Sequence, residues 1–307
     1  MTAHAGLQAS TSYRLSKRWA FAGLLFPAIG VIAVFMIAPV AIVFVYSFLQ
    51  PERYGGVVWS FSTEGYLQIL FERDFLDGSL QFSADYVLIL WRSVFQAAIC
   101  TVLCLMISVP MAYFIATRSE RSKSIWIFLI TVPYWVNLLI RTIALLFILR
   151  DDGPVNKLIM MTGFVQGPLP LSYNNFAIGL GLVYSFLPFM VLPLYSAFER
   201  FDFRLLEAAY DLYASRRVAF FKIVLPVMRP GLIAGSLLVF IPSIGSYLAP
   251  DILGGGKTLM IGNLIGTQFQ GAHNWPFGAA LSMILLTVTL IVLIWMARRA
   301  ARKNVGY

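Results

Sequence analysis

Long apolar runs, spaced along nearly the whole chain, constrain this sequence more than any other feature. A helix that crosses a lipid bilayer needs about 20 mostly apolar residues. Segments of at least roughly that length run over Trp19–Leu49, Val87–Thr117, Ile125–Leu149, Phe176–Phe198, Gly231–Leu248 and Phe277–Ala297. Hydrophobic residues make up 59% of the chain and charged residues only 12%, too few to cover so apolar a core in water. The sequence therefore predicts an all-α integral membrane protein with six transmembrane helices.

The runs leave room for one domain and two short tails. We expect a cytoplasmic N-terminal tail over 1–18, a six-helix transmembrane domain over 19–297, and a cytoplasmic C-terminal tail over 298–307. The first run exceeds the roughly 7–15 apolar residues of a signal peptide. We therefore expect it to be retained as a helix.

Lysines and arginines gather in alternate segments between the runs. They cluster at Arg14, Lys17, Arg18, Arg118, Arg121, Lys123, Arg200, Arg204, Arg216, Arg217, Lys222, Arg229, Arg298, Arg299, Arg302 and Lys303. The other connections, 50–86, 150–173 and 251–276, hold few cations. Because cytoplasmic loops carry the excess of Lys and Arg, both termini and the connection over 199–230 are predicted to be cytoplasmic.

Several function classes lack the residues that they need. The net charge of +9 is split into short clusters rather than forming a continuous basic face, which argues against nucleic-acid binding. The two histidines, His4 and His273, belong to no metal-binding motif, and Cys100 and Cys104 are expected to be packing residues. We predict no catalytic residue and no metal site. A secondary transporter is the alternative class, but no run holds an Asp or Glu well inside it, as ion coupling would require.

The connection over 199–230 is amphipathic. Asp202 can cap a first helix, in which Leu205, Leu206, Ala209, Leu212 and Tyr213 recur at helical spacing. Ser215 can cap a second helix, which Pro226 and Pro230 end. The pattern predicts a compact helix–turn–helix with one apolar side and one cationic side.

Within this connection, Glu207-Ala208-Ala209 is followed by Ile223-Val224-Leu225-Pro226. This spacing resembles the EAA signature of permease subunits of ATP-binding-cassette (ABC) importers. The resemblance implies a type I, six-helix permease whose loop forms coupling helices that dock into a groove on the ATPase. The coupling residues that it implies are Glu207, Ala208, Ala209, Tyr213, Arg216, Ile223, Leu225 and Pro226.

One position departs from the family pattern, which has glycine where this chain has Tyr213. Glycine suits a turn that needs a positive φ, and tyrosine there would be strained. Either the turn is rearranged or Tyr213 fills part of the docking groove.

The resemblance also implies partners and a location. These are an ABC ATPase dimer, a second and different permease, a periplasmic solute-binding protein and membrane lipid, in the bacterial inner membrane. ATP and Mg would be bound by the ATPase, which would also hydrolyse the ATP. This chain is therefore expected to bind no cofactor and to have no enzymatic activity.

Longer stretches resemble one branch of that family. The segments 132–141, 181–196, 253–263 and 274–280 are similar to spermidine/putrescine permeases of the PotB type. The resemblance implies uptake of a polyamine or a related cation. The alternative is a permease for another small organic solute, amino-acid-derived or carboxylate-bearing.

Candidate pathway residues lie near the third and fifth runs. Asp251, beside Tyr247, could hold an alkylammonium by ion pairing and cation–π contact, or could cap a helix end in water. Tyr134 and Trp135 could stack on a substrate or serve as packing. The sequence does not decide between these alternatives.

Arg141 lies within the third run, one helical turn from Asn137. A charge at that depth costs about 2.5–3.5 kcal/mol on insertion scales, so it needs a partner or a water-filled path. We favour an inter-helix tie to Asp151 or Asp152 over a pathway role. An arginine in the pathway would repel a polycation and favour a carboxylate-bearing solute.

Overall fold

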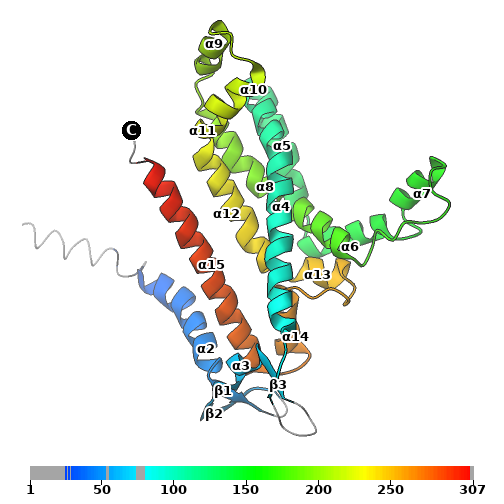
Figure 1. The fold of residues 1–307 in the computed structure, drawn as a ribbon, viewed down its shortest axis with the longest axis vertical. Helices are drawn as coiled ribbons and strands as arrows, with labels where there is room; N and C mark the ends of the chain where they lie inside the picture. The colour runs from blue at the N-terminus through cyan, green and yellow to red at the C-terminus, as the bar shows by residue number, and fades with distance from the viewer. Residues whose placement is uncertain (1–24, 26, 28, 53–54, 74–79, 305–307) are drawn as a thin grey trace, which may run out of the picture.

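The computed structural model describes residues 25, 27, 29–52, 55–73 and 80–304, and the description below is of these residues (Figure 1). Among them, four helical segments are long and apolar enough to cross a membrane: Ile29–Tyr46, α4 (Asp85–Ala116), α8 (Asn175–Glu199) and Trp275–Arg298 of α15 (Trp275–Asn304). Two bent helix pairs raise the number to as many as six. The predicted N-terminal tail and the start of the first run lie outside the described residues.

The second, fourth and sixth runs match observed helices to within a few residues, except that α15 continues to Asn304. The first comprises a π-helical turn, η1 (Ala33–Ile37), and α2 (Ala38–Tyr46), and ends before Leu49. None of the residues in its spanning segment, Ile29–Tyr46, is buried within the chain. This helix is therefore placed to meet lipid or another subunit.

The prediction of one continuous helix over Ile125–Leu149 is wrong. The segment divides into α5 (Glu120–Thr131), a 3₁₀ turn η2 (Val132–Trp135) and α6 (Leu138–Leu149), and the two arms meet at 92°. Pro133 has no N–H for an α-helical bond, and Val136 is extended. Asn137 then starts a new helix, its Oδ1 accepting a hydrogen bond from the Leu139 N–H at 2.8 Å.

The fifth run is also shorter than predicted. The helix α12 (Arg229–Ile244) ends at Gly245, and Leu248 begins a separate short helix, α13 (Leu248–Leu253). Glycine is a poor helix former, which favours this end. At its other end α12 meets the helical segment Arg216–Val227 at a 69° bend.

A three-helix core of α4, α8 and α12 carries the rest of the fold. Small residues on α4 and α12 let the backbones approach, as is usual between membrane helices. A Cβ added at Gly235 would lie 2.7 Å from Met190 Sδ, and one added at Gly231 would lie 2.6 Å from Ala197 Cβ. Glycine at these two positions therefore lets α12 lie close to α8.

Short strands occur outside the spans, which the all-helical prediction did not include. β1 (Leu49–Pro51) pairs antiparallel with β2 (Val57–Phe61), with a register shift between Leu49 and Gln50. β3 (Phe71–Arg73) pairs antiparallel with β4 (Leu80–Phe82), with Glu72 opposite Gln81. With α3 (Glu64–Leu67) they form a small cap on one end of the bundle, beside the junction of α14 (Ile261–Gln270) and α15 (Figure 1).

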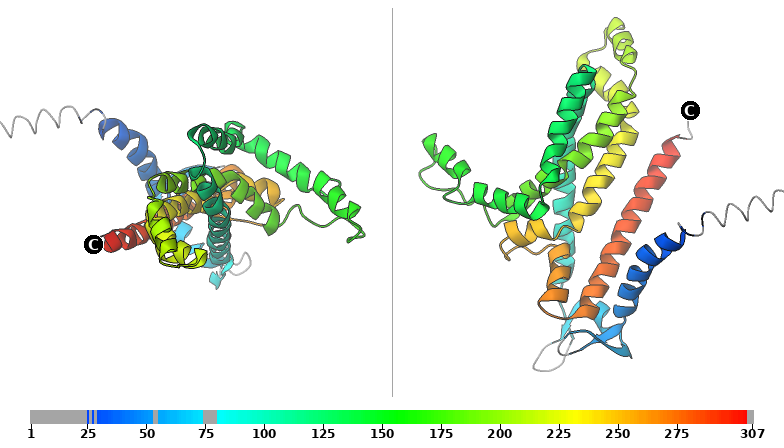
Figure 2. Two further views of the ribbon diagram at one scale, coloured as in Figure 1. Left: turned by 90° about the horizontal axis from the view of Figure 1, so that it is seen from above. Right: turned by 180° about the vertical axis from the view of Figure 1, so that it is seen from behind.

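The opposite end carries the connections predicted to be cytoplasmic. The junction of α4 and α5 lies there with α9 (Arg204–Asp211), α10 (Arg216–Ala219), η3 (Phe220–Val224) and α11 (Leu225–Val227), and the C-terminal end of α15 points the same way (Figures 1 and 2). α6 and α7 (Pro154–Met161) project sideways as an arm, and α6 packs on α13 (Figure 1).

Candidate functional site

The connection over 199–230 folds as two short helices joined by a tight turn. Ser215 caps the second helix, its Oγ accepting a hydrogen bond from the Val218 N–H at 3.4 Å. Asp202 lies one position before the cap residue Phe203, yet its Oδ1 accepts a hydrogen bond from the Arg204 N–H at 3.0 Å. Both predicted capping side chains therefore bond to the first turns of these helices.

The turn between α9 and α10 keeps the geometry that suits glycine. Tyr213 has φ +58°. Its N–H donates to Tyr210 O at 2.9 Å, and the Ala214 N–H donates to Ala209 O at 3.0 Å. These two bonds are those of a Schellman helix end. Of the two alternatives raised by the sequence, the turn is therefore not rearranged, and a tyrosine occupies the left-handed conformation at a cost of about 1–2 kcal/mol.

The apolar side of the connection is divided between two surroundings. Leu206, Ala209, Ala219 and Val224 are buried in the same core as α4, α8 and α12. The family resemblance implies that the apolar stripe packs into the docking groove, but these four residues instead anchor the loop to its own bundle. This burial ties the position of the loop to the three-helix core.

The outward surface of the connection carries the remaining implied coupling residues. Glu207, Ala208 and Arg216 are exposed, and Ile223, Leu225 and Pro226 are half-buried. The side chains at the turn extend furthest into solvent: Leu212 is 82% exposed and Tyr213 98%. This arrangement presents charged and apolar groups together at the end of the molecule.

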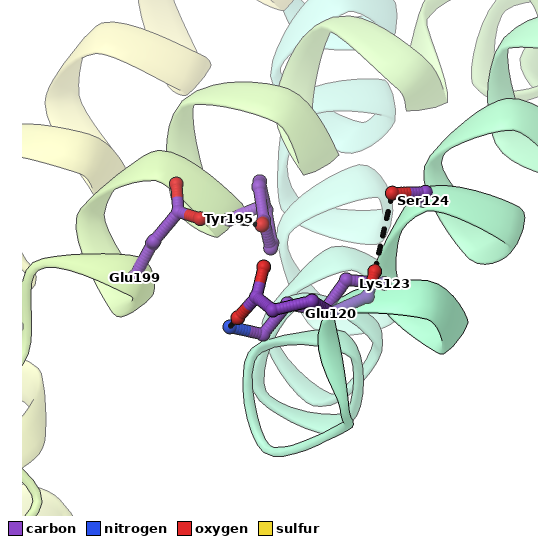
Figure 3. Close-up of polar contacts among 5 residues, drawn as sticks. All are labelled: Glu120, Lys123, Ser124, Tyr195 and Glu199. Atoms are coloured by element: carbon purple, nitrogen blue, oxygen red, sulfur yellow. Dashed lines mark hydrogen bonds and ion pairs between the residues drawn. The ribbon is translucent and has the colours of Figure 1, made fainter.

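Two polar pairs, each within one helix, lie where the loop end of α8 is next to the start of α5 (Figure 3). Tyr195 Oη donates to Glu199 Oε1 at 2.8 Å, and Lys123 Nζ lies 2.7 Å from Glu120 Oε1. Figure 3 shows the two pairs lying beside one another. These pairs were not predicted, although their four-residue and three-residue spacings are typical of contacts on one helix face.

A cleft of about 410 Å³ is lined by the C-terminal part of α8, the end of α11 and the start of α12. Its walls are mostly apolar, and Arg200 lines it. A guanidinium is a poor neighbour for a cationic solute, so we do not assign this cleft to a cation.

The first group of pathway candidates lies at the break between η2 and α6. The Tyr134 ring packs edge-on against Phe189 of α8 with centroids 4.9 Å apart. Trp135 is 75% exposed and packs against Phe128 of α5. The Asn137 side chain caps the N-terminus of α6. The break thus presents one half-exposed and one strongly exposed aromatic ring.

Arg141 is 93% buried, since its relative exposure is 7%. The expected tie to Asp151 or Asp152 is not among the ion pairs of the described residues, and Asp152 lies instead 3.4 Å from Arg150. Arg141 Cζ lies 4.9 Å from the centroid of the Tyr134 ring. Among the described residues its Nε and Nη1 have no hydrogen-bond partner. Burying a cation with so few hydrogen-bond acceptors lowers the stability of the fold at this point.

The second group of candidates lies on α13. Asp251 is exposed in the first turn of this helix, and its N–H donates to Tyr247 O at 3.2 Å. Tyr247 is half-buried, with its ring against Gly266 of α14. Because α13 packs on α6, the structure brings the two groups of candidates onto neighbouring elements.

The cysteines lie inside the core. Cys100 and Cys104 are fully buried, with sulfur atoms 4.0 Å apart, and Ser243 Oγ lies 3.7 Å from Cys100 Sγ. Within the described part of the chain, no three His, Cys, Asp or Glu side chains lie close enough together to hold a metal ion. The two thiols have the surroundings of packing residues.

Comparison with known proteins places the sequence among transport proteins. Residues 108–305 match the family described as "Binding-protein-dependent transport system inner membrane component". The spermidine/putrescine transport system permease protein PotB of Salmonella typhimurium (strain SL1344) is 37% identical over 280 residues, 91% of this chain and 93% of that protein. The protein of the same name from Escherichia coli K12 is 36% identical over 279 residues, covering 90% and 97%.

A solved structure shares the fold. A chain in the crystal structure of a bacterial ABC transporter involved in the import of the acidic polysaccharide alginate superposes with a TM-score of 0.71. The superposition covers 95% of this chain and 99% of that one, at 12% sequence identity. At that identity the likeness concerns the fold alone.

Proposed function

Because this chain belongs to the family of binding-protein-dependent transport system inner membrane components, we propose that it forms half of the solute pathway of an ATP-driven importer and transmits ATPase motion through the 199–230 loop. The observation that carries this proposal is the loop itself. Its inner side is continuous with the core of α4, α8 and α12, and its outer side exposes Glu207 and Arg216 at the end of the molecule. Such a loop can pass a displacement at its surface directly to the spanning helices.

The proposed solute is a polyamine such as spermidine or putrescine. Support comes from the relatives named for this transport, which are 36–37% identical over about nine-tenths of the chain. Asp251 offers an exposed carboxylate next to α6, and Tyr134 and Trp135 offer aromatic faces. Carboxylates and aromatic rings together suit alkylammonium groups.

The proposed assembly contains this chain, a second and different permease, an ABC ATPase dimer and a periplasmic solute-binding protein, in the bacterial inner membrane. ATP and Mg would bind the ATPase, and both termini would be cytoplasmic. The alternation of lysine and arginine along the sequence supports this orientation.

In the proposed coupling step, the ATPase contacts the outer side of α9 and α10. Glu207, Ala208 and Arg216 would contact it at this exposed surface, and the half-buried Ile223, Leu225 and Pro226 would hold the continuation of the second helix in place. Closure of the ATPase pair would then turn α8 and α12 about the 69° bend between the loop and α12. Helix-in-groove contact of this kind depends on side-chain register.

The test is uptake of labelled putrescine and spermidine by cells that express the complete operon, under ATP depletion and separately with a protonophore. We expect uptake to require ATP and to survive the protonophore. In Glu207→Ala it should fall at least about tenfold, because the variant loses part of the coupling free energy between ATPase and permease, and couplings of about 1–3 kcal/mol correspond to about 5–150-fold. Glu52→Ala, which alters an exposed glutamate outside the loop, serves as the control. Unchanged uptake in Glu207→Ala would remove the role assigned to the loop.

Arg141 favours a second candidate solute, one that carries a carboxylate. Its guanidinium is buried near the candidate residues and has unpaired nitrogen atoms among the described residues. A carboxylate accepts two parallel hydrogen bonds from such a group. Absence of polyamine uptake by a fully assembled transporter, together with ATP-dependent uptake of an amino-acid-derived anion, would favour this candidate.

A further inference from the structure

Three residues other than glycine have a positive φ in the described part of the chain: Tyr173 (+59°), Tyr213 (+58°) and His273 (+53°). The first and third lie against neighbouring segments. The Tyr173 ring covers Gly255, and the His273 side chain lies beside Gly55, 3.3 Å from the position of an added Cβ. Tyr213 differs, because its side chain is 98% exposed.

The fold does not need the Tyr213 ring. The turn needs a left-handed residue, and the two backbone hydrogen bonds of the helix end would form equally with glycine. Contacts within the chain therefore do not offset the strain of a tyrosine here. Strained backbone that the fold itself does not explain occurs at binding and switching sites.

We propose that Tyr213 and Leu212 form a knob that inserts into a cavity of the ATPase subunit and makes this permease specific for an ATPase with that cavity. This inference rests on the proposed function. A rigid aromatic side chain with an aliphatic neighbour is the kind of anchor that contributes most to binding at protein interfaces.

The position of the knob favours a cytoplasmic protein over lipid as its occupant. Figure 1 shows α9 and its connection to α10 beyond the ends of α4 and α5, away from the bundle. Exposed side chains of both charges flank the knob, with Glu207 and Asp211 before it and Arg216 and Arg217 after it. An apolar centre with a charged rim is the usual composition of a specific protein interface, whereas a lipid-binding surface of this kind carries mainly basic residues.

The test compares variants of the full permease pair in lipid nanodiscs, titrated with the purified cognate ATPase. Tyr213→Gly removes the ring and relieves the strain, so the melting temperature should stay equal or rise. ATPase affinity should fall about tenfold or more, as for truncation of an interface anchor. Tyr213→Phe should bind within about threefold of wild type, because the ring remains.

Tyr173→Gly is the matched control, since it relieves strain at nearly the same φ but lies outside the loop. It should leave ATPase affinity unchanged. Wild-type affinity in Tyr213→Gly would overturn the inference, as would an equal loss in both glycine variants. If the wild-type pair does not bind the ATPase at all, the proposed function fails; if wild type and Tyr213→Gly bind equally, only the knob fails.

Discussion

At the scale of single residues, Asp251 and Arg141 place opposite charges on two elements that pack together. Asp251 is exposed on α13, and Arg141 is buried on α6. For a cationic solute the carboxylate attracts and the guanidinium repels, so the two groups together shape the electrostatic profile along these elements. Each can be tested alone.

We expect Asp251→Asn to reduce putrescine uptake about three- to tenfold, because the amide keeps the shape but loses the charge that pairs with an ammonium group. The measurement is the concentration dependence of uptake by the complete transporter. Glu52→Gln, which alters an exposed glutamate outside the coupling loop, controls for the general effect of removing a surface carboxylate. Equal uptake by Asp251→Asn and wild type would mean that Asp251 does not bind the solute and serves only in the first turn of α13.

We expect Arg141→Met to stabilise the purified permease pair by about 1–3 kcal/mol, because it removes a buried cation whose Nε and Nη1 lack acceptors among the described residues. The measurement is thermal unfolding in detergent. Arg150→Met, at a half-exposed arginine beside Asp152, should change stability by less than about 1 kcal/mol. A clear loss of stability in Arg141→Met would mean that the guanidinium has a strong partner in the assembled pair.

The residue scale also shows what a sequence can predict. Ser215 and Asp202 were identified as capping side chains because capping depends on residues a few positions apart. The tie from Arg141 to Asp151 or Asp152 was predicted because a charge inside an apolar run needs a partner. The break at Pro133–Asn137 turns α6 away, and the position of Arg141 then depends on packing against α8 and α13, which local spacing does not reveal.

At the scale of elements, the close contact between α8 and α12 depends on small residues of α12. A Cβ at Gly235 would meet Met190 Sδ at 2.7 Å and Met190 O at 3.3 Å. Hydropathy predicted the existence and approximate ends of α4, α8 and α15 but did not identify this contact. Long apolar periodicity is local information, whereas the role of Gly235 depends on a helix about 45 residues earlier in the chain.

We expect Gly235→Ala to destabilise the permease by about 1–3 kcal/mol, because the added methyl group forces α8 and α12 apart. Thermal unfolding of the detergent-purified pair measures this. Gly30→Ala, where nothing lies within 4 Å of the added carbon, should be neutral or slightly stabilising, since alanine is the better helix former. Similar melting temperatures for Gly235→Ala and wild type would indicate that α8 and α12 can move apart without loss of stability.

At the scale of the whole molecule, the two ends of the bundle differ in chemistry. One end carries the loop over 199–230 and its exposed charges, and the other carries the strands and exposed aromatic side chains such as Trp59 and Phe61. The distribution of lysine and arginine predicts which connections share a side of the membrane, because that rule needs only composition. The structure places the α4–α5 junction, the loop over 199–230 and the C-terminal end of α15 toward one end of the bundle. The strands were not predicted, because such short segments leave only a weak hydropathy signal. The sideways course of α6 was not predicted either, because hydropathy marks an apolar run but does not reveal the break at Pro133–Asn137 within it.

The orientation can be measured with single cysteines and a membrane-impermeant maleimide on spheroplasts. Cys100 and Cys104 have no exposed surface, so the native thiols should stay unlabelled and give a clean background. Trp59→Cys and Phe164→Cys, at positions 79% and 91% exposed, should react in intact spheroplasts. Arg217→Cys, exposed in the loop, should react only after permeabilisation. Labelling of Arg217→Cys in intact spheroplasts would put the loop outside, where no cytoplasmic ATPase could reach it, and would exclude the coupling role on which the proposed importer depends.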